Sequence, residues 1–180
     1  MKKILALAGS NSKNSINHKL VNYVASRIES HEVKVIRLID YQFPMYGIDL
    51  QNERGIPTDI QVLKNIIAEH DALIISVSEH NGSISAYFKN IIDWLSRAEL
   101  KFLEGKKVLL MSTSTGKRGG ASSLAYFKDT LPRFGAEVVE SFSLPSFNEN
   151  FNIEENKIVD EITLLGLNDV VSNFEQALQE

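Results

Sequence analysis

The chain has 180 residues, of which 43% are hydrophobic and 23% charged, a composition typical of one globular domain covering residues 1–180. Its net charge of −4 argues against the positive field with which proteins hold nucleic acid or an anionic membrane. Because the chain has no cysteine, disulfides, thiolate metal sites and cysteine nucleophiles are excluded, and any redox chemistry requires a cofactor.

The apolar stretch 4–8 is too short for a secretory signal, and no longer apolar run follows it. We therefore expect no membrane insertion and a cytoplasmic location.

Short apolar runs rich in β-branched residues alternate with segments of helical periodicity. The expected strands cover 3–8, 33–39, 72–78, 107–112 and 136–140, and the expected helices cover 15–30, 59–69, 84–98, 120–134 and 157–178. The third helix has the clearest pattern, because Ile84, Phe88, Ile91 and Leu95 recur at steps of three and four. Trp94 in this helix is interpreted first as a core residue, second as a contact to a partner helix and last as a ligand contact.

Strands that alternate with helices predict an α/β fold, in which helices cover both faces of a parallel sheet. Five strands favour a doubly wound three-layer sandwich of the flavodoxin-like order 2-1-3-4-5, in which ligands bind beyond the carboxyl ends of strands 1 and 3. The segment 40–58 has no clear period and contains Pro44 and Gly47, so we expect a lid or a dimer contact there. Its aromatic side chains either border the ligand site of a neighbouring subunit or anchor the loop.

The loop after the first strand, Gly9 to Asn17, has six hydroxyl or amide side chains in nine residues and leads into a helix. Short donors, helix-start amides and Lys13 suit a phosphate group. The alternative is that Ser15 merely caps the helix and the rest is an ordinary polar loop. The loop has neither the P-loop pattern nor the G-x-G-x-x-G dinucleotide fingerprint.

The loop after the third strand, Ser78 to Ser83, presents several backbone amides that suit the polar edge of a flat heterocycle. His80 is interpreted as a stacking or surface group rather than a general base, and Glu79 as a hydrogen-bonding residue rather than an acid catalyst. The four histidines show no metal-ligand spacing, and we expect no metal site.

Together these segments resemble the NADPH-dependent FMN reductase family over about the first 140 residues. The resemblance rests on Gly9-Ser10-x-x-x-x-Ser15-x-Asn17, Glu79-x-Asn81-Gly82-Ser83-Ile84, Phe88-Lys89-Asn90 with Asp93-Trp94-Leu95, and Ser114-x-Gly116-x-x-Gly119-Gly120. It implies a flavodoxin-like homodimer or homotetramer, associating through the 84–98 helix. FMN then accepts hydride from NADPH or NADH and passes electrons to a flavin, quinone, azo, nitro or metal-oxyanion acceptor.

The resemblance implies that the FMN phosphate lies on the first loop and the isoalloxazine between the second loop and the loop after the fourth strand. The implied cofactor-binding residues are Ser10, Ser12, Ser15, Ile16, Asn17, Ser78, Glu79, His80, Asn81, Gly82, Ser114 and Gly116. No protein residue is assigned a catalytic role, because the chemistry takes place on FMN N5. Lys117 and Arg118 are candidates to attract the 2′-phosphate of NADPH.

Three positions depart from the family: Ser12 stands where arginine is common, Ser78 where proline is, and His80 where tyrosine is. Loss of the arginine removes a bidentate phosphate partner unless Lys13 substitutes for it. The alternatives to an NAD(P)H-dependent FMN reductase are a flavodoxin-type electron carrier and a non-catalytic flavin-binding module.

Overall fold

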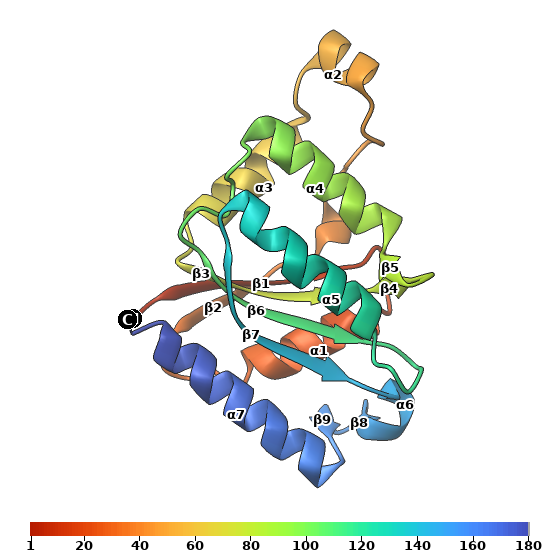
Figure 1. Cartoon of the computed structure of the whole chain (residues 1–180), viewed down its shortest axis with the longest axis vertical. Coiled ribbons are helices and arrows are strands. Elements are labelled where there is room, and N and C mark those ends of the chain that lie inside the picture. The colour runs from red at the N-terminus through yellow and green to blue at the C-terminus, as the bar shows by residue number, and fades with distance from the viewer. Residues whose placement is uncertain (180) are drawn as a thin grey trace.

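The computed structural model describes residues 1–179 and contains a five-stranded parallel sheet between two layers of helices (Figure 1). The strands are β1 (Lys3–Gly9), β2 (Glu32–Val35), β3 (Ala72–Val77), β6 (Lys107–Thr113) and β7 (Glu137–Leu144). They pair in the order β2-β1-β3-β6-β7, which confirms the predicted flavodoxin-like order and doubly wound sandwich.

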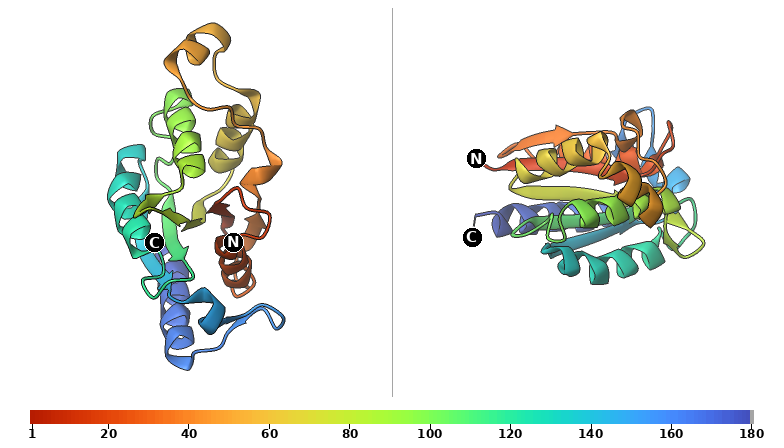
Figure 2. Two further views of the ribbon diagram at one scale, coloured as in Figure 1. Left: turned by 90° about the vertical axis from the view of Figure 1, so that its right-hand side faces the viewer. Right: turned by 90° about the horizontal axis from the view of Figure 1, so that it is seen from above.

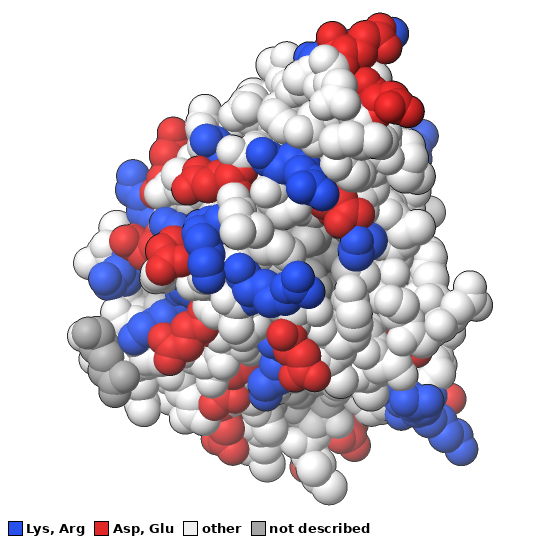
Figure 3. Space-filling model, turned by 45° about the horizontal axis from the view of Figure 1, so that its top comes forward, with Lys and Arg blue, Asp and Glu red and all other residues white. Residues whose placement is uncertain are grey.

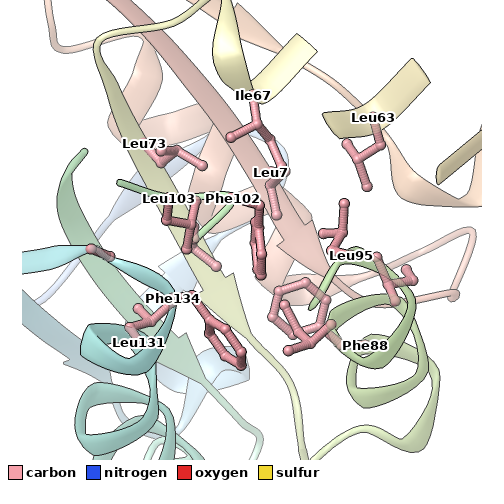
Figure 4. Close-up of a cluster of buried hydrophobic side chains, with 14 of the residues drawn as sticks. Leu7, Leu63, Ile67, Leu73, Phe88, Leu95, Phe102, Leu103, Leu131 and Phe134 are labelled. Atoms are coloured by element: carbon pink, nitrogen blue, oxygen red, sulfur yellow. The ribbon is translucent and has the colours of Figure 1, made fainter. Parts of the chain in front are cut away.

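Helices cover both faces of this sheet because its central strands are apolar on both sides. One face packs against α1 (Ile16–Ala25) and α7 (Glu161–Ala177), and the other against α3 (Thr58–Ala68), α4 (Ala86–Ala98) and α5 (Ala121–Thr130). Along β1, Leu5 and Leu7 join the cluster beneath α3, α4 and α5, whereas Ile4 joins the one on the other face. Figure 4 shows how Leu7 lies between side chains of α3 and α4 in this core.

Several predicted boundaries move where a local hydrogen bond competes with the periodicity. The helix expected over 157–178 begins only at Glu161, because the Asp160 side chain caps it by accepting from the Thr163 amide at 2.8 Å. The residues before it form a small hairpin of β8 (Phe151–Asn152) and β9 (Lys157–Ile158). The helix expected over 15–30 ends at Ala25. The helix expected over 120–134 is α5 as far as Thr130, and its last four residues form a 3-10 helix, η2 (Leu131–Phe134), with proline near its start.

The strands show similar adjustments at their ends. β2 stops at Val35 and is followed by a 3-10 turn, η1 (Leu38–Asp40), whereas β7 extends four residues beyond the predicted 136–140. None of these changes alters the order of the elements.

The segment 40–58 contains a short helix, α2 (Ile48–Arg54), that projects from the body of the domain (Figures 1 and 2). No residue of α2 is buried, so its sequence carries no apolar stripe by which periodicity analysis finds a helix. The base of the segment is fixed by Trp94, which is fully buried and whose Nε1 donates to the Pro44 carbonyl at 2.8 Å. The Tyr46 ring packs edge-on against Trp94 at 4.9 Å. The interpretation of Trp94 as a core residue is confirmed.

No helix within residues 1–179 combines the length and the apolar character that crossing a membrane requires.

Candidate functional site

A cleft opens where β1, β3 and β6 end, on the side of the domain that faces the viewer in the left view of Figure 2. It measures about 620 Å³ including the part open to solvent, which is a usual size for a small-molecule site. Its lining comes from three loops and consists of Ser10, Ser12, Asn14, Ser15, Ile16, Asn17, Ser78, Glu79, His80, Thr113, Ser114 and Thr115.

The first loop is held in shape by its own hydroxyl groups. The Ser10 Oγ accepts from the Ser12 amide at 3.2 Å, and the Ser12 Oγ accepts from the Asn14 amide at 3.3 Å. Ser15 caps α1 by accepting from the His18 amide at 3.1 Å. Ser15 therefore is a helix cap, as the alternative interpretation held, yet it also lies in the cleft beside the first-turn amides of Ile16 and Asn17. Those amides have no partner within the helix. Unpaired amides at a helix start favour the binding of an anion.

Asn17 joins α1 to two strands of the sheet. Its Oδ1 accepts from the Ser76 hydroxyl at 2.7 Å and the Thr113 amide at 3.1 Å, while its Nδ2 donates to the Thr113 carbonyl at 3.1 Å. The side chain is buried and its bonds hold the ends of β3 and β6 against the first loop. The Asn17 side chain thus makes its hydrogen bonds within the protein.

The second loop is a hairpin of β4 (Glu79–His80) and β5 (Ser83–Ile84). Asn81 and Gly82 form its two-residue turn, with φ of 53° and 79°. Two-residue hairpin turns with positive φ at both positions favour the pair Asn-Gly. The Glu79 carboxylate accepts from the Ser123 amide at 3.0 Å in the first turn of α5, while His80 is exposed beside the cleft. Glu79 is therefore a hydrogen-bonding residue, as expected from the sequence.

The third loop is anchored to the segment that follows β7. The Ser114 and Gly116 carbonyls accept from the Phe147 and Ser146 amides at 3.0 and 2.9 Å, and the Gly116 amide donates to the Ser114 Oγ at 3.3 Å. Gly119 has a φ of 58°, and a Cβ there would lie 2.9 Å from the Leu144 carbonyl carbon, so only glycine fits.

The structure brings together most of the predicted site residues, although Asn81, Gly82 and Gly116 lie outside the cleft lining. Asn14, Thr113 and Thr115 line the cleft but were not singled out. Each is adjacent to a predicted residue, and that adjacency is the signal that identifies them.

Gly9 ends β1 directly beneath the aromatic ring of Phe88, and a Cβ at Gly9 would lie 2.5 Å from two atoms of that ring. We expect Gly9→Ala to lower the free energy of unfolding by about 1–3 kcal/mol because the buried ring must shift. Urea denaturation measures this, with Gly166→Ala as the control. Gly166 lies in α7 with no atom near its would-be Cβ, so that change should stabilise the protein by about 0.5–1 kcal/mol.

Shrinking the ring should relieve the clash. Gly9→Ala combined with Phe88→Leu should lose at least about 1 kcal/mol less than the sum of the two single changes. Strict additivity would show that the close contact is not the cause.

Removal of the Glu79 carboxylate should destabilise α5, since it satisfies an amide in the first turn of that helix. We expect Glu79→Ala to cost about 0.5–2 kcal/mol and Glu79→Gln less, because the amide oxygen still accepts. Thermal unfolding measured beside the exposed Glu29→Ala tests the difference. Equal losses for the Ala and Gln variants would mean that the hydrogen bond contributes nothing.

The sequence model of the NADPH-dependent FMN reductase family matches residues 2–149. A quinone reductase from Escherichia coli K12 is 29% identical over 98% of this chain and 95% of its own length, and an Arabidopsis thaliana NADPH:quinone oxidoreductase is 28% identical over 96% and 90%. The solved structure of FerB, a flavoenzyme NAD(P)H:(acceptor) oxidoreductase from Paracoccus denitrificans, superposes with a TM-score of 0.80 at 27% identity, covering 99% of this chain and 98% of that one. The chain therefore belongs to the NADPH-dependent FMN reductase family, whose members are enzymes that use FMN and NAD(P)H.

Proposed function

We propose that the cleft binds FMN, with its phosphate on the first loop and its ring system between the second and third loops. The observation that carries this is the first loop, whose serine hydroxyls and free helix-start amides surround one end of the cleft. Donors without an internal partner at a helix start suit a phosphate dianion. The remainder of the cleft lies between hairpin β4–β5 and the loop after β6, and a ring system placed there has one loop on each side.

Bound FMN supplies the group that accepts hydride from NAD(P)H and passes electrons to an acceptor. The protein contributes position and electrostatics. Backbone amides of the Ser78–Gly82 segment and the start of α4 are favourable neighbours for negative charge on the ring. His80 is exposed at the mouth of the cleft and offers a side wall for the stacked nicotinamide or acceptor. Lys117 and Arg118, both exposed after β6, remain the candidates for attracting a 2′-phosphate.

The acceptor we propose is a quinone, since the E. coli and A. thaliana relatives are named for quinone reduction. Free flavins, azo dyes, nitro compounds and metal oxyanions are the other electron acceptors that we propose.

The first test is the visible spectrum of protein purified without added flavin, followed by anaerobic NADPH. We expect oxidised-flavin bands that bleach on NADPH and return on addition of a quinone. Bands that do not bleach would indicate a flavodoxin-type carrier. A colourless protein that also ignores added FMN would overturn the site.

We further propose that two copies associate through α4. A groove of about 990 Å³, including its open part, runs between α4 and α5, and its lining includes the exposed Leu100 and Tyr126. Figure 3 shows Lys and Arg side chains interspersed with Asp and Glu side chains, and uncharged surface between them. Light scattering should give twice the chain mass, and Leu100→Glu should give the monomer. A monomeric parent protein would contradict the proposal.

The cytoplasmic location of the protein stays a prediction.

A further inference from the structure

Arg37 holds the first loop from behind. It lies between β2 and η1, is half-buried, and its Nη2 donates to the Lys13 carbonyl at 3.0 Å. The amide at the other end of the same peptide, that of Asn14, donates to the Ser12 Oγ at 3.3 Å. The peptide between Lys13 and Asn14 is thus fixed at both ends, and the bond at its carbonyl comes from a residue 24 positions away.

Arg37 also lines a recess next to the proposed phosphate position. A small recess on the reverse side of the loop is lined by Ala8, Ser10, Ser12, Ser15, His18, Arg37, Leu38 and Ile39. Three of these, Ser10, Ser12 and Ser15, also line the cleft. Arg37 and the cleft therefore have three serines as shared neighbours, and the Arg37 charge is near enough to act on a phosphate bound at them.

Arg37 is the permanent charge in this recess. Burial, and next the Arg37 charge, lower the pKa of His18, while Asp40 raises it and Lys19 lowers it. His18 is thereby kept neutral near pH 7, whereas a guanidinium stays protonated. Lys13, which lies in the first loop itself, is exposed, so water and salt screen the charge of its side chain.

We propose that Arg37 is an electrostatic positioning residue for the FMN phosphate and supplies from behind the loop the positive charge that Ser12 does not provide. This inference rests on the proposed function. It differs from the expectation that Lys13 takes that role, because the half-buried and fixed Arg37 charge is screened less than the exposed lysine.

The test compares FMN with riboflavin, which lacks the phosphate. Flavin fluorescence quenching on flavin-free protein gives both dissociation constants for the parent, Arg37→Gln, Arg37→Lys and Lys13→Gln. Arg37→Gln loses the charge, and because its side chain is two bonds shorter it also frees the Lys13 carbonyl, an effect that Arg37→Lys and the riboflavin constant separate from the loss of charge. We expect it to weaken FMN binding about tenfold and riboflavin binding less than twofold, and to reduce the salt dependence of FMN binding.

The control variants separate charge from loop geometry. Arg37→Lys should keep the ratio of the two dissociation constants within about threefold of the parent, and Lys13→Gln should change it by less than Arg37→Gln. If Arg37→Gln does not fold, as judged by thermal unfolding, the lysine variant decides, because a tenfold change in its ratio overturns the inference.

Other outcomes identify which proposal fails. An unchanged FMN constant in Arg37→Gln, or equal losses for FMN and riboflavin, overturns the role of Arg37 and leaves the proposed function intact. A parent protein that binds neither flavin overturns the proposed function, and the inference with it.

Discussion

Replacing Asn17 with alanine is expected to lower the free energy of unfolding by about 3–5 kcal/mol, the largest effect of any polar substitution near the cleft. The side chain is buried and takes part in three hydrogen bonds with Ser76 and Thr113. Alanine leaves a backbone amide, a backbone carbonyl and a hydroxyl without their partner. Each unpaired buried group costs about 1–3 kcal/mol, which partial relaxation and water entry reduce.

Urea denaturation followed by circular dichroism measures this loss. Asn22→Ala is a matched control, because Asn22 lies in the same helix and is exposed, and its change should stay within about 0.5 kcal/mol. We also expect Asn17→Ala to weaken FMN binding, since the ends of β3 and β6 are no longer fastened to the first loop. A stability loss below about 1 kcal/mol would show that Asn17 does not hold the site together.

Trp94→Ala is expected to cost about 3–5 kcal/mol, because a fully buried indole leaves a cavity in the core. Trp94→Phe should cost less, mainly through loss of the 2.8 Å hydrogen bond to the Pro44 carbonyl. Both variants loosen the base of the segment that carries α2, where Asn90 remains as a second anchor through its bonds to the Pro44 carbonyl and the Tyr46 amide.

Two measurements test this prediction. Urea denaturation gives the stability loss, with the exposed Leu165→Ala in α7 as the control. Limited trypsin digestion reports on the segment, and cleavage after Arg54 should be faster in both Trp94 variants than in the parent. Unchanged cleavage would mean that Trp94 does not fix the segment, even if stability falls.

The sequence by itself determined the fold and the location of the cleft. Alternation of apolar strands and amphipathic helices depends on neighbours in the chain, so 3–8 and 72–78 are recognisable without the rest. Since parallel strands place their carboxyl ends at one edge, the loops after strands 1, 3 and 4 had to meet. The serine-rich loop before α1 is likewise recognisable from neighbouring residues alone, because it stands between an apolar strand and an amphipathic helix.

Only the tertiary structure decided how the site is held together. Asn17 bonds to Thr113, 96 residues away, Glu79 caps a helix 44 residues on, and Arg37 reaches Lys13 across 24 residues. Each of these side chains has polar partners of many kinds available along the chain, and no local period selects among them. α2 was missed for a related reason, because a helix with no fully buried residue has no apolar stripe. Periodicity records which face of an element meets the core, whereas long-range hydrogen bonds depend on where folding places two distant backbones.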